Sequence, residues 1–361
     1  MSWIVLIGLV IYLVYSFYIA ANGVQLLNKE RHSRIDQLPD VSIVIPFRNE
    51  MKKLPGLLRS LSFLDYPNEK LEIILINDHS TDGWERLALD QFDLQLTTIN
   101  CNGIGKKAAL SDGIAFANNE IIIQTDADCI VPATWINSML NALGNNDMVC
   151  GSVLFSNSKL QNLELFAYQG LGKSTLKLNA PIIANGANMA YRKTAFIAVG
   201  GFEDNKGISS GDDVFLLRSF AKEKKRIVYV LSESARVWTR SESNFLGIIK
   251  QRIRWAGKTK STSHIGTIAA GLILVLTNFY VCLHFIFWLA FDLTSEVAEI
   301  GILIKFTIDG LFLLLVARQL KNYWPLLYLP IAIPLYSLYI VLIAFLCVFI
   351  RPEWKNRKIQ I

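Results

Sequence analysis

The sequence has few of the residues from which disulfide frameworks, zinc sites and histidine-centred catalysis are built. Its 361 residues include five cysteines and four histidines. The cysteines are odd in number and never form a Cys-x-x-Cys pair, which argues against a disulfide framework or a thiolate zinc site and fits a reducing compartment. The histidines are scattered, and no internal repeat is present. We therefore expect neither a catalytic triad nor a histidine-bound metal.

Charged residues are scarce at the two ends of the chain. The composition is 52% hydrophobic with a mean hydropathy of +0.35, which is too apolar for an ordinary soluble domain. Residues 3–20 carry no charge, and a bilayer span needs about 20 apolar residues. A signal peptide would place a basic residue before a shorter apolar core, whereas no Lys or Arg precedes Trp3. We expect an uncleaved transmembrane anchor at residues 1–22.

The C-terminal third is apolar again. Candidate spans lie at 266–291, 300–317 and 326–350, which predicts a transmembrane region of about three segments at 264–350 and a basic, cytoplasmic or interfacial tail at 351–361. Lys305 and Asp309 interrupt the middle span, and their i, i+4 spacing predicts an ion pair on one helix face. Pro330 and Pro334 predict a kink or break in the last span.

The positive charge of the chain gathers beside these apolar segments. The net charge is +6, and the flanking cations are Lys29, Arg31, Arg34, Lys250, Arg252, Arg254, Lys258, Lys260, Arg351, Lys355, Arg357 and Lys358. The positive-inside rule makes these flanks and the central domain cytoplasmic, in a multi-pass protein of the cell inner (plasma) membrane. This distribution argues against nucleic acid as a partner.

One conflict follows from that rule. One N-terminal and three C-terminal spans place the basic C-terminus outside if the loop at 318–324 is inside. Either one segment is re-entrant or interfacial, or the rule fails at the last span, and the sequence leaves both alternatives open.

Residues 38–260 have the pattern of an α/β domain. Apolar, strand-like runs alternate with helical spacing at 50–64 and 105–117; the runs lie at 41–47, 71–76, 94–99 and 120–125. This alternation predicts a parallel sheet with helices on both faces, and such sheets bind ligands at the carboxyl ends of their strands. Asp78 and the pair Asp126 and Asp128 follow two of these runs.

Asp126 and Asp128 are separated by one residue directly after a buried strand. Two carboxylates so placed can converge on one hard cation, and Mg²⁺ or Mn²⁺ there would bridge them to a diphosphate. The structural alternative is a solvated turn.

Three nearby features have weaker signals. Asp78 can accept hydrogen bonds from a base or ribose, or form an Asx-turn. Lys106 and Lys107 follow Gly105 before a predicted helix, and either lysine could steady phosphates with the helix N-terminus, although a solvated helix start explains them equally well. Asp82, in the sequence Thr81-Asp82-Gly83, predicts the capped start of a helix.

Two adjacent carboxylates introduce a later apolar helix. An inverting transfer needs one carboxylate near the acceptor hydroxyl to take its proton, and we assign this role to Asp213. A metal can assist the departing nucleotide, so that no second protein acid is required. We expect Asp212 to cap the helix.

A Gln-x-x-Arg-Trp box precedes the second apolar region. Helical spacing allows Gln251, Arg254 and Trp255 to share one face. The forked donors of Arg254 suit a diphosphate, and Trp255 offers a flat wall for a sugar ring. The alternative is an interfacial belt of Arg and Trp, but the carboxylates in the same chain favour a functional box.

Together these residues resemble the family 2 glycosyltransferases, which are inverting and membrane-embedded. The matching segments are VSIVIPFRNE (41–50), INDHSTDG (76–83), GKKAAL (105–110), TDADC (125–129), NGANMAYRKTAFIAVGGF (185–202), GDDVFLL (211–217) and QRIRW (251–255). The resemblance covers about residues 41–260 and implies a GT-A fold, a nucleoside-diphosphate sugar donor and a divalent metal.

Carried onto this chain, the resemblance implies a role for each matching residue. Asp78 would contact the nucleoside, Asp126 and Asp128 the diphosphate and metal, and Asp213 would be the base. Glu50 would approach the nucleotide, and Gln251, Arg254 and Trp255 would form the donor–acceptor box. One departure is Asp212, since the family often has Glu there.

The resemblance predicts a hexosyltransferase-type enzyme that acts on a lipid-linked or growing cell-envelope glycan. The short C-terminal membrane region puts a self-sufficient translocation channel in doubt, so processive polysaccharide synthesis is the alternative. A catalytically silent scaffold of the same fold is a second alternative, which the intact carboxylates argue against.

Overall fold

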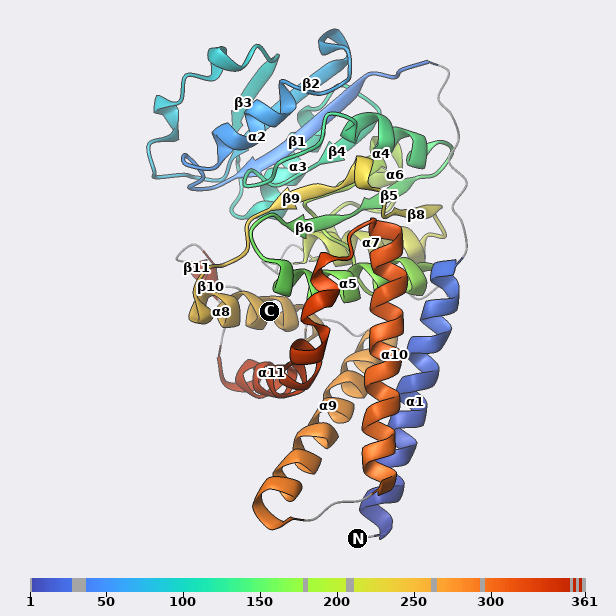
Figure 1. Ribbon diagram of the computed structural model, residues 1–361. Coiled ribbons are helices and arrows are strands. Elements are labelled where there is room, and N and C mark those ends of the chain that lie inside the picture. Colours follow the sequence, from blue (N-terminus) through green and yellow to red (C-terminus); the bar gives the residue numbers. More distant parts are fainter. Residues whose placement is uncertain are drawn as a thin grey trace.

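The computed structural model describes residues 2–27, 37–177, 181–205, 211–260, 265–292 and 296–350, together with the short strands β10 (Glu353–Trp354) and β11 (Arg357–Lys358). An α/β domain stands on a group of long helices from both ends of the chain (Figure 1). Of the predicted cationic flanks, Lys29, Arg31, Arg34, Arg351 and Lys355 lie outside the described residues.

The centre of the domain is a seven-stranded mixed sheet. Its strands, in spatial order, are β3 (Leu96–Asn100), β2 (Leu71–Asn77), β1 (Val41–Phe47), β4 (Ile121–Gln124), β7 (Met189–Arg192), β5 (Met148–Gly151) and β8 (Ile227–Val230). Strands β1 to β4 are parallel, as the four apolar runs predict, while β7 runs antiparallel to both neighbours. A second sheet pairs β6 (Val153–Phe155) with β9 (Val237–Thr239).

Both faces of the sheet are covered, which explains the continuous apolar strands. Ile43 of β1 packs with α2 (Leu54–Leu61) and α4 (Trp135–Leu143). Its neighbour Val44 points to the opposite face and packs with α3 (Lys106–Phe116), α6 (Lys193–Ala198) and α7 (Asp212–Lys222). Because successive strand side chains alternate between faces, a strand buried on both sides must be apolar throughout.

The predicted helix start at Asp82 is wrong. The chain forms only 3-10 turns there, η2 (Trp84–Arg86) and η3 (Leu89–Phe92). The Asp82 carboxylate instead accepts a hydrogen bond from the Met51 backbone N–H at 2.7 Å. This contact across two loops satisfies the side chain that local sequence assigns to a cap.

Helix α5 (Lys159–Lys177) joins the domain to the long helices. It packs against both α1 (Ser2–Leu27) and α10 (Glu296–Leu320). A Cβ atom on Gly170 would lie 2.5 Å from Val316 of α10, so the close approach of the two helices requires glycine. Phe166 and Val316 belong to the same buried cluster as the sheet residue Val44, which makes the core continuous.

Within the described residues, three helical segments are long and apolar enough to cross a membrane: α9 (Ile265–Phe291), α10, and Trp324–Phe349, which comprises η6 (Trp324–Tyr328) and α11 (Leu329–Phe349). Lys305 and Asp309 of α10 form the predicted ion pair, at 2.6 Å. The Tyr15 hydroxyl of α1 donates to Asp309 at 2.7 Å, which ties α1 along α10. The membrane anchor at residues 1–22 remains a prediction.

Helix α11 is bent along its length. Figure 1 shows it changing direction, and Pro334 lies inside it, where it lacks the N–H of a regular helix. Its C-terminal half packs on α8 (Phe245–Lys260): Ile343 and Cys347 bury against Ile249 and Ile253.

Candidate functional site

Asp78 lies where β2 ends, beside the start of α3. Its backbone N–H donates to the Phe47 carbonyl at 2.8 Å, and its Oδ1 accepts from the Gly105 N–H at 3.0 Å. Gly105 has φ +97°, a conformation open to glycine, and α3 follows directly. The Asx-turn forms on Asn77, whose Oδ1 accepts from the Ser80 N–H. The Asp78 side chain is not the one that forms this turn, and Asp78 lines the cavity described below.

Asp126 and Asp128 follow β4, at the same sheet edge. The Lys106 ammonium lies 2.7 Å from Asp126 Oδ1 and 3.0 Å from Asp212 Oδ2. Burial raises the pKa of Asp126, and Lys106 opposes that rise. Burial alone would lower the pKa of Lys106, but Asp126 and Asp212 outweigh it and raise that pKa. Lys53 approaches Asp128 Oδ2 at 3.5 Å.

The predicted cap at Asp212 is wrong. Gly211 occupies the cap position with φ +82°, and Asp212 begins helix α7. Its Oδ2 faces Lys106 and lies 3.3 Å from Gln124 Nε2. A Cβ atom on Gly186 would lie 2.5 Å from the same oxygen, so the turn at Gly186 makes room for this carboxylate.

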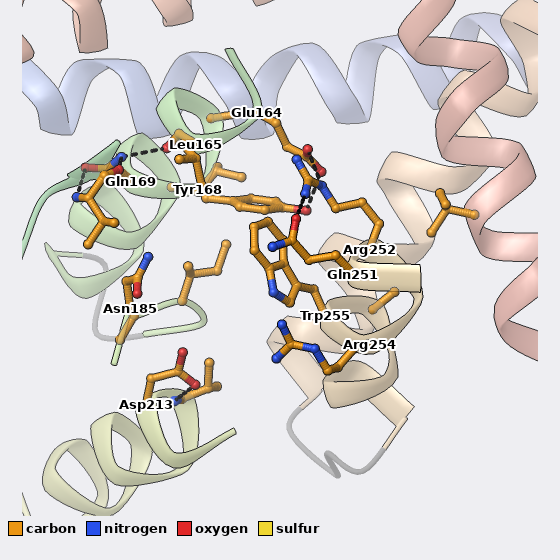
Figure 2. A pocket seen from close by; sticks show the side chains of 18 of the residues that line it. Glu164, Leu165, Tyr168, Gln169, Asn185, Asp213, Gln251, Arg252, Arg254 and Trp255 are labelled. Carbon is orange, nitrogen blue, oxygen red and sulfur yellow. Dashed lines mark hydrogen bonds and ion pairs between the residues drawn. The ribbon is translucent and has the colours of Figure 1, made fainter. Parts of the chain in front are cut away.

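Asp213 is buried in the first turn of α7 and lines the cavity. Its Oδ1 accepts a hydrogen bond from the Val214 N–H at 2.8 Å. Figure 2 shows Asp213 facing the cavity, on the side to which Arg254 extends. The carboxylate is thus held by its own helix and directed at the open space.

Helix α8 contributes the predicted Gln251, Arg254 and Trp255, and all three line the cavity. Figure 2 shows the Trp255 ring between the side chains of Arg252 and Arg254. Burial lowers the pKa of Arg254, and the negative charges of Asp126 and Asp213 oppose that shift.

Glu50 follows β1 and lines the cavity from a third loop. Its carboxylate lies 3.6 Å from the Lys53 ammonium. Lys53 therefore links Glu50 to Asp128, and the first loop of the domain reaches the carboxylate pair.

One cavity of about 1840 Å³ joins all of these residues to the long helices. Asp126, Asp213 and Arg254 line its polar part. Apolar walls come from α9, α10 and α11, and include Leu272, Phe312 and Ile340. A molecule with a polar head and an apolar chain would match the two parts.

Asp126 and Asp128 fit a magnesium or manganese ion. Among the described residues, no group of three or more Asp, Glu, His or Cys side chains has the arrangement of a complete metal site. Mg²⁺ is commonly held by one or two carboxylates and completed by substrate phosphates and water. The donor set therefore suits a metal that arrives with a diphosphate.

Sequence reasoning missed several residues of the site. Gln124, at the end of β4, donates to the Gly186 carbonyl at 2.8 Å and so positions the turn beside Asp212. Glu164 and Arg252 form a buried ion pair beside the Trp255 ring. The available signals were a polar residue ending an apolar strand and a glutamate flanked by the leucines Leu163 and Leu165.

Comparisons with known proteins agree with this geometry. The model of the family "Glycosyl transferase family 2" matches residues 42–200. The chain is 27% identical over 184 residues to the probable glycosyltransferase YdaM of Bacillus subtilis, covering 46% of this chain and 44% of that protein. It is 27% identical over 260 residues to a poly-beta-1,6-N-acetyl-D-glucosamine synthase of Staphylococcus epidermidis, covering 67% and 60%.

Among solved structures, the chain resembles the mannosyltransferase PcManGT from Pyrobaculum calidifontis, solved with GDP-Man and Mn²⁺. The TM-score is 0.58 at 18% identity, covering 96% of this chain and 97% of that one. The chain carries a family 2 glycosyltransferase domain, and the predicted GT-A fold is confirmed. The matches span 44% to 60% of the length of the curated relatives named above.

Proposed function

We propose that the protein is a membrane-bound, metal-dependent inverting glycosyltransferase that moves a hexose-type sugar from a nucleoside-diphosphate sugar to a lipid-linked or growing cell-envelope glycan. The observation that carries this proposal is the single cavity that connects Asp126, Asp213 and Arg254 with the apolar walls of α9 to α11. A soluble acceptor would have no use for those walls.

The donor fits the polar part of the cavity. In this proposal Asp78 and Glu50 receive the nucleoside, and Lys106 and Arg254 offset the charge of the diphosphate. Asp126 and Asp128 would hold Mg²⁺ or Mn²⁺, which would supply further positive charge to the leaving group. The solved mannosyltransferase with GDP-Man and Mn²⁺ supports this type of donor and metal.

Asp213 acts as the base in this proposal. It takes the proton from the acceptor hydroxyl while that oxygen attacks the anomeric carbon on the face opposite the diphosphate. The bond from the anomeric carbon to the diphosphate oxygen breaks, and the nucleoside diphosphate leaves with the electron pair. A single displacement of this kind inverts the anomeric configuration.

The acceptor fits the other part of the cavity. Gln251 and Trp255 lie between the carboxylates and the long helices, where a sugar ring or headgroup can pack on the indole. An apolar chain would follow the walls of α9 to α11. Processive synthesis is the second candidate, because one relative is a polysaccharide synthase and the cavity passes beyond Trp255.

The test is nucleotide release by the detergent-solubilised protein, with a panel of nucleotide-sugars, Mn²⁺ or Mg²⁺, and extracted membrane lipids. We expect release from one donor, stimulated by the lipids and lost in Asp213→Asn. Product length then separates single transfer from processive synthesis. No release from any donor with lipids present would contradict the proposed function and favour a silent scaffold.

For localisation, we propose a multi-pass protein of the inner membrane with its catalytic domain in the cytoplasm. The packing of the C-terminal half of α11 on α8 supports the re-entrant or interfacial alternative for the last segment, which returns the C-terminus to the cytoplasm. A reporter fused after residue 361 should report a cytoplasmic position. An external position would mean that the positive-inside rule fails at this segment.

A further inference from the structure

We propose that Glu164 and Arg252 are positioning residues that set Gln251 and Trp255 for the acceptor. This inference rests on the proposed function, and it concerns two residues that the Gln-x-x-Arg-Trp pattern does not specify: Arg252 occupies its first variable position, and Glu164 lies on α5. Figure 2 shows the arrangement: Arg252 extends from α8 to Glu164 of α5, on the side of Trp255 opposite Arg254.

The ion pair is deeply buried and well supported. Arg252 Nε lies 2.7 Å from Glu164 Oε2, and the two residues are 2% and 7% exposed. The Tyr168 hydroxyl donates to Glu164 Oε1 at 3.0 Å, and Arg252 Nη2 donates to Gln161 Oε1 at 3.2 Å. Each charged group therefore has a second partner on α5, which fixes its orientation.

The same guanidinium touches both acceptor-side residues of the box. Its central carbon lies 4.4 Å from the centroid of the Trp255 ring, and Nη1 donates to Gln251 Oε1. Tyr168, the partner of Glu164, meets the Trp255 ring edge-on at 5.9 Å between centroids. The Trp255 indole therefore contacts two side chains, Arg252 and Tyr168, that both bind the carboxylate of Glu164 on α5. These contacts fix the orientation of the ring.

A role in stability alone explains this cluster less well. Replacing a buried ion pair with apolar residues is often neutral or stabilising, whereas such a pair can select one geometry. Only a planar guanidinium can stack on an indole while it donates to a carboxylate and an amide in fixed directions. The use of arginine here matches a need for orientation.

The substrate affected should be the acceptor. Gln251 and Trp255 lie between the carboxylates and the apolar walls, whereas Arg254 extends towards Asp213 (Figure 2). Loosening the indole should therefore raise the KM for the acceptor and lower kcat, with little change in nucleotide binding.

The experiment compares Arg252→Lys and Glu164→Gln with the control Arg236→Lys. Arg236 is also buried, but it contacts Trp238 and the Leu320 carbonyl and does not line the cavity. We expect the first two variants to raise the acceptor KM about tenfold, as displacement of the desolvated guanidinium from the indole implies. Nucleotide affinity by calorimetry should stay within about twofold of wild type.

A second readout separates this inference from the proposed function. In protein labelled with 5-fluorotryptophan, the Trp255 ¹⁹F resonance is assigned by its loss in Trp255→Phe. It should shift or broaden in Arg252→Lys and Glu164→Gln, but not in the control, even if no acceptor is turned over. An unchanged Trp255 resonance, or an equal loss of nucleotide affinity and transfer, would overturn the inference. Glu164→Gln is isosteric and keeps the test available if Arg252→Lys fails to fold.

Discussion

Arg252 and Arg254 are two residues apart on helix α8, and their side chains face different partners on opposite sides of the helix. At about 100° per residue, their side chains leave α8 about 200° apart. Arg254 extends towards the carboxylates at the sheet edge, whose charges oppose the effect of burial on its pKa. Arg252 turns to α5 and is held by Glu164. We propose that the same residue type serves the donor directly in one case and the acceptor indirectly in the other.

The two parts of the cavity repeat this contrast. The carboxyl ends of β1, β2 and β4 supply ionisable groups that suit a diphosphate and a metal. Helices α9 to α11 supply apolar walls that suit a lipid chain. Trp255 lies between these parts, so perturbations on either side should affect different kinetic constants.

The largest effect should come from the proposed base. Asp213→Asn keeps the shape of the side chain but cannot take a proton, so kcat should fall by about 10²- to 10⁴-fold. Nucleotide affinity should be retained, as measured by calorimetry. Asp147→Asn is the matched control, since Asp147 forms an ion pair with Arg226 away from the cavity. Comparable transfer by Asp213→Asn would contradict the base assignment.

A smaller but still large effect is expected at the metal pair. Asp128→Ala should remove one of the two proposed metal ligands and lower kcat/KM by about 10²-fold, since a bound metal contributes several kcal/mol. Nucleotide affinity should lose most of its dependence on Mn²⁺. If affinity with and without metal is unchanged from wild type, Asp128 does not bind the metal.

The two arginines provide the sharpest form of the comparison. Arg254→Lys keeps the charge but loses the fork, so the donor KM should rise about tenfold, as loss of one hydrogen bond to a charged group implies. Its acceptor KM should change little, which is the reverse of the expectation for Arg252→Lys. Steady-state kinetics with each substrate varied in turn would show that one variant changes mainly the donor KM and the other mainly the acceptor KM. Equal changes of the donor KM and the acceptor KM in either variant would refute the division of the cavity into a donor part and an acceptor part.

The smallest effect on transfer is expected in the long helices. Lys305→Met removes the ammonium partner of the partly buried Asp309, which keeps the hydrogen bond from Tyr15, and should destabilise the protein by up to about 3–5 kcal/mol. The double variant Lys305→Met, Asp309→Leu should recover most of that stability in thermal unfolding. Turnover per folded molecule should match wild type in both. A large loss of turnover in the double variant would indicate that this pair takes part in acceptor binding.

Much of the fold could be predicted from the sequence, because burial on both faces leaves a strong signal. The runs ending before Asp78 and Asp126 are continuous and apolar, and their strand ends meet at one sheet edge. Helix spacing likewise predicted the Lys305–Asp309 pair.

The remaining features depend on contacts between distant segments. The local sequence predicts Asp212 as a helix cap, but Gly211 occupies the cap position. The Asp212 carboxylate instead contacts the Lys106 ammonium and the Gln124 side-chain amide. The Asp82 carboxylate does not cap a helix, because it accepts a hydrogen bond from the Met51 N–H in another loop. Glu164 and Arg252 are 88 residues apart, and no local pattern pairs them.

The most direct test of the proposed transfer is the anomeric configuration of the product. The wild-type protein would be supplied with its α-linked nucleotide-sugar, metal and membrane-lipid acceptor, and the isolated product analysed by NMR. A single displacement with Asp213 as base predicts a β-linked product and none from Asp213→Asn. An α-linked product, or product formation that survives the substitution, would contradict the mechanism.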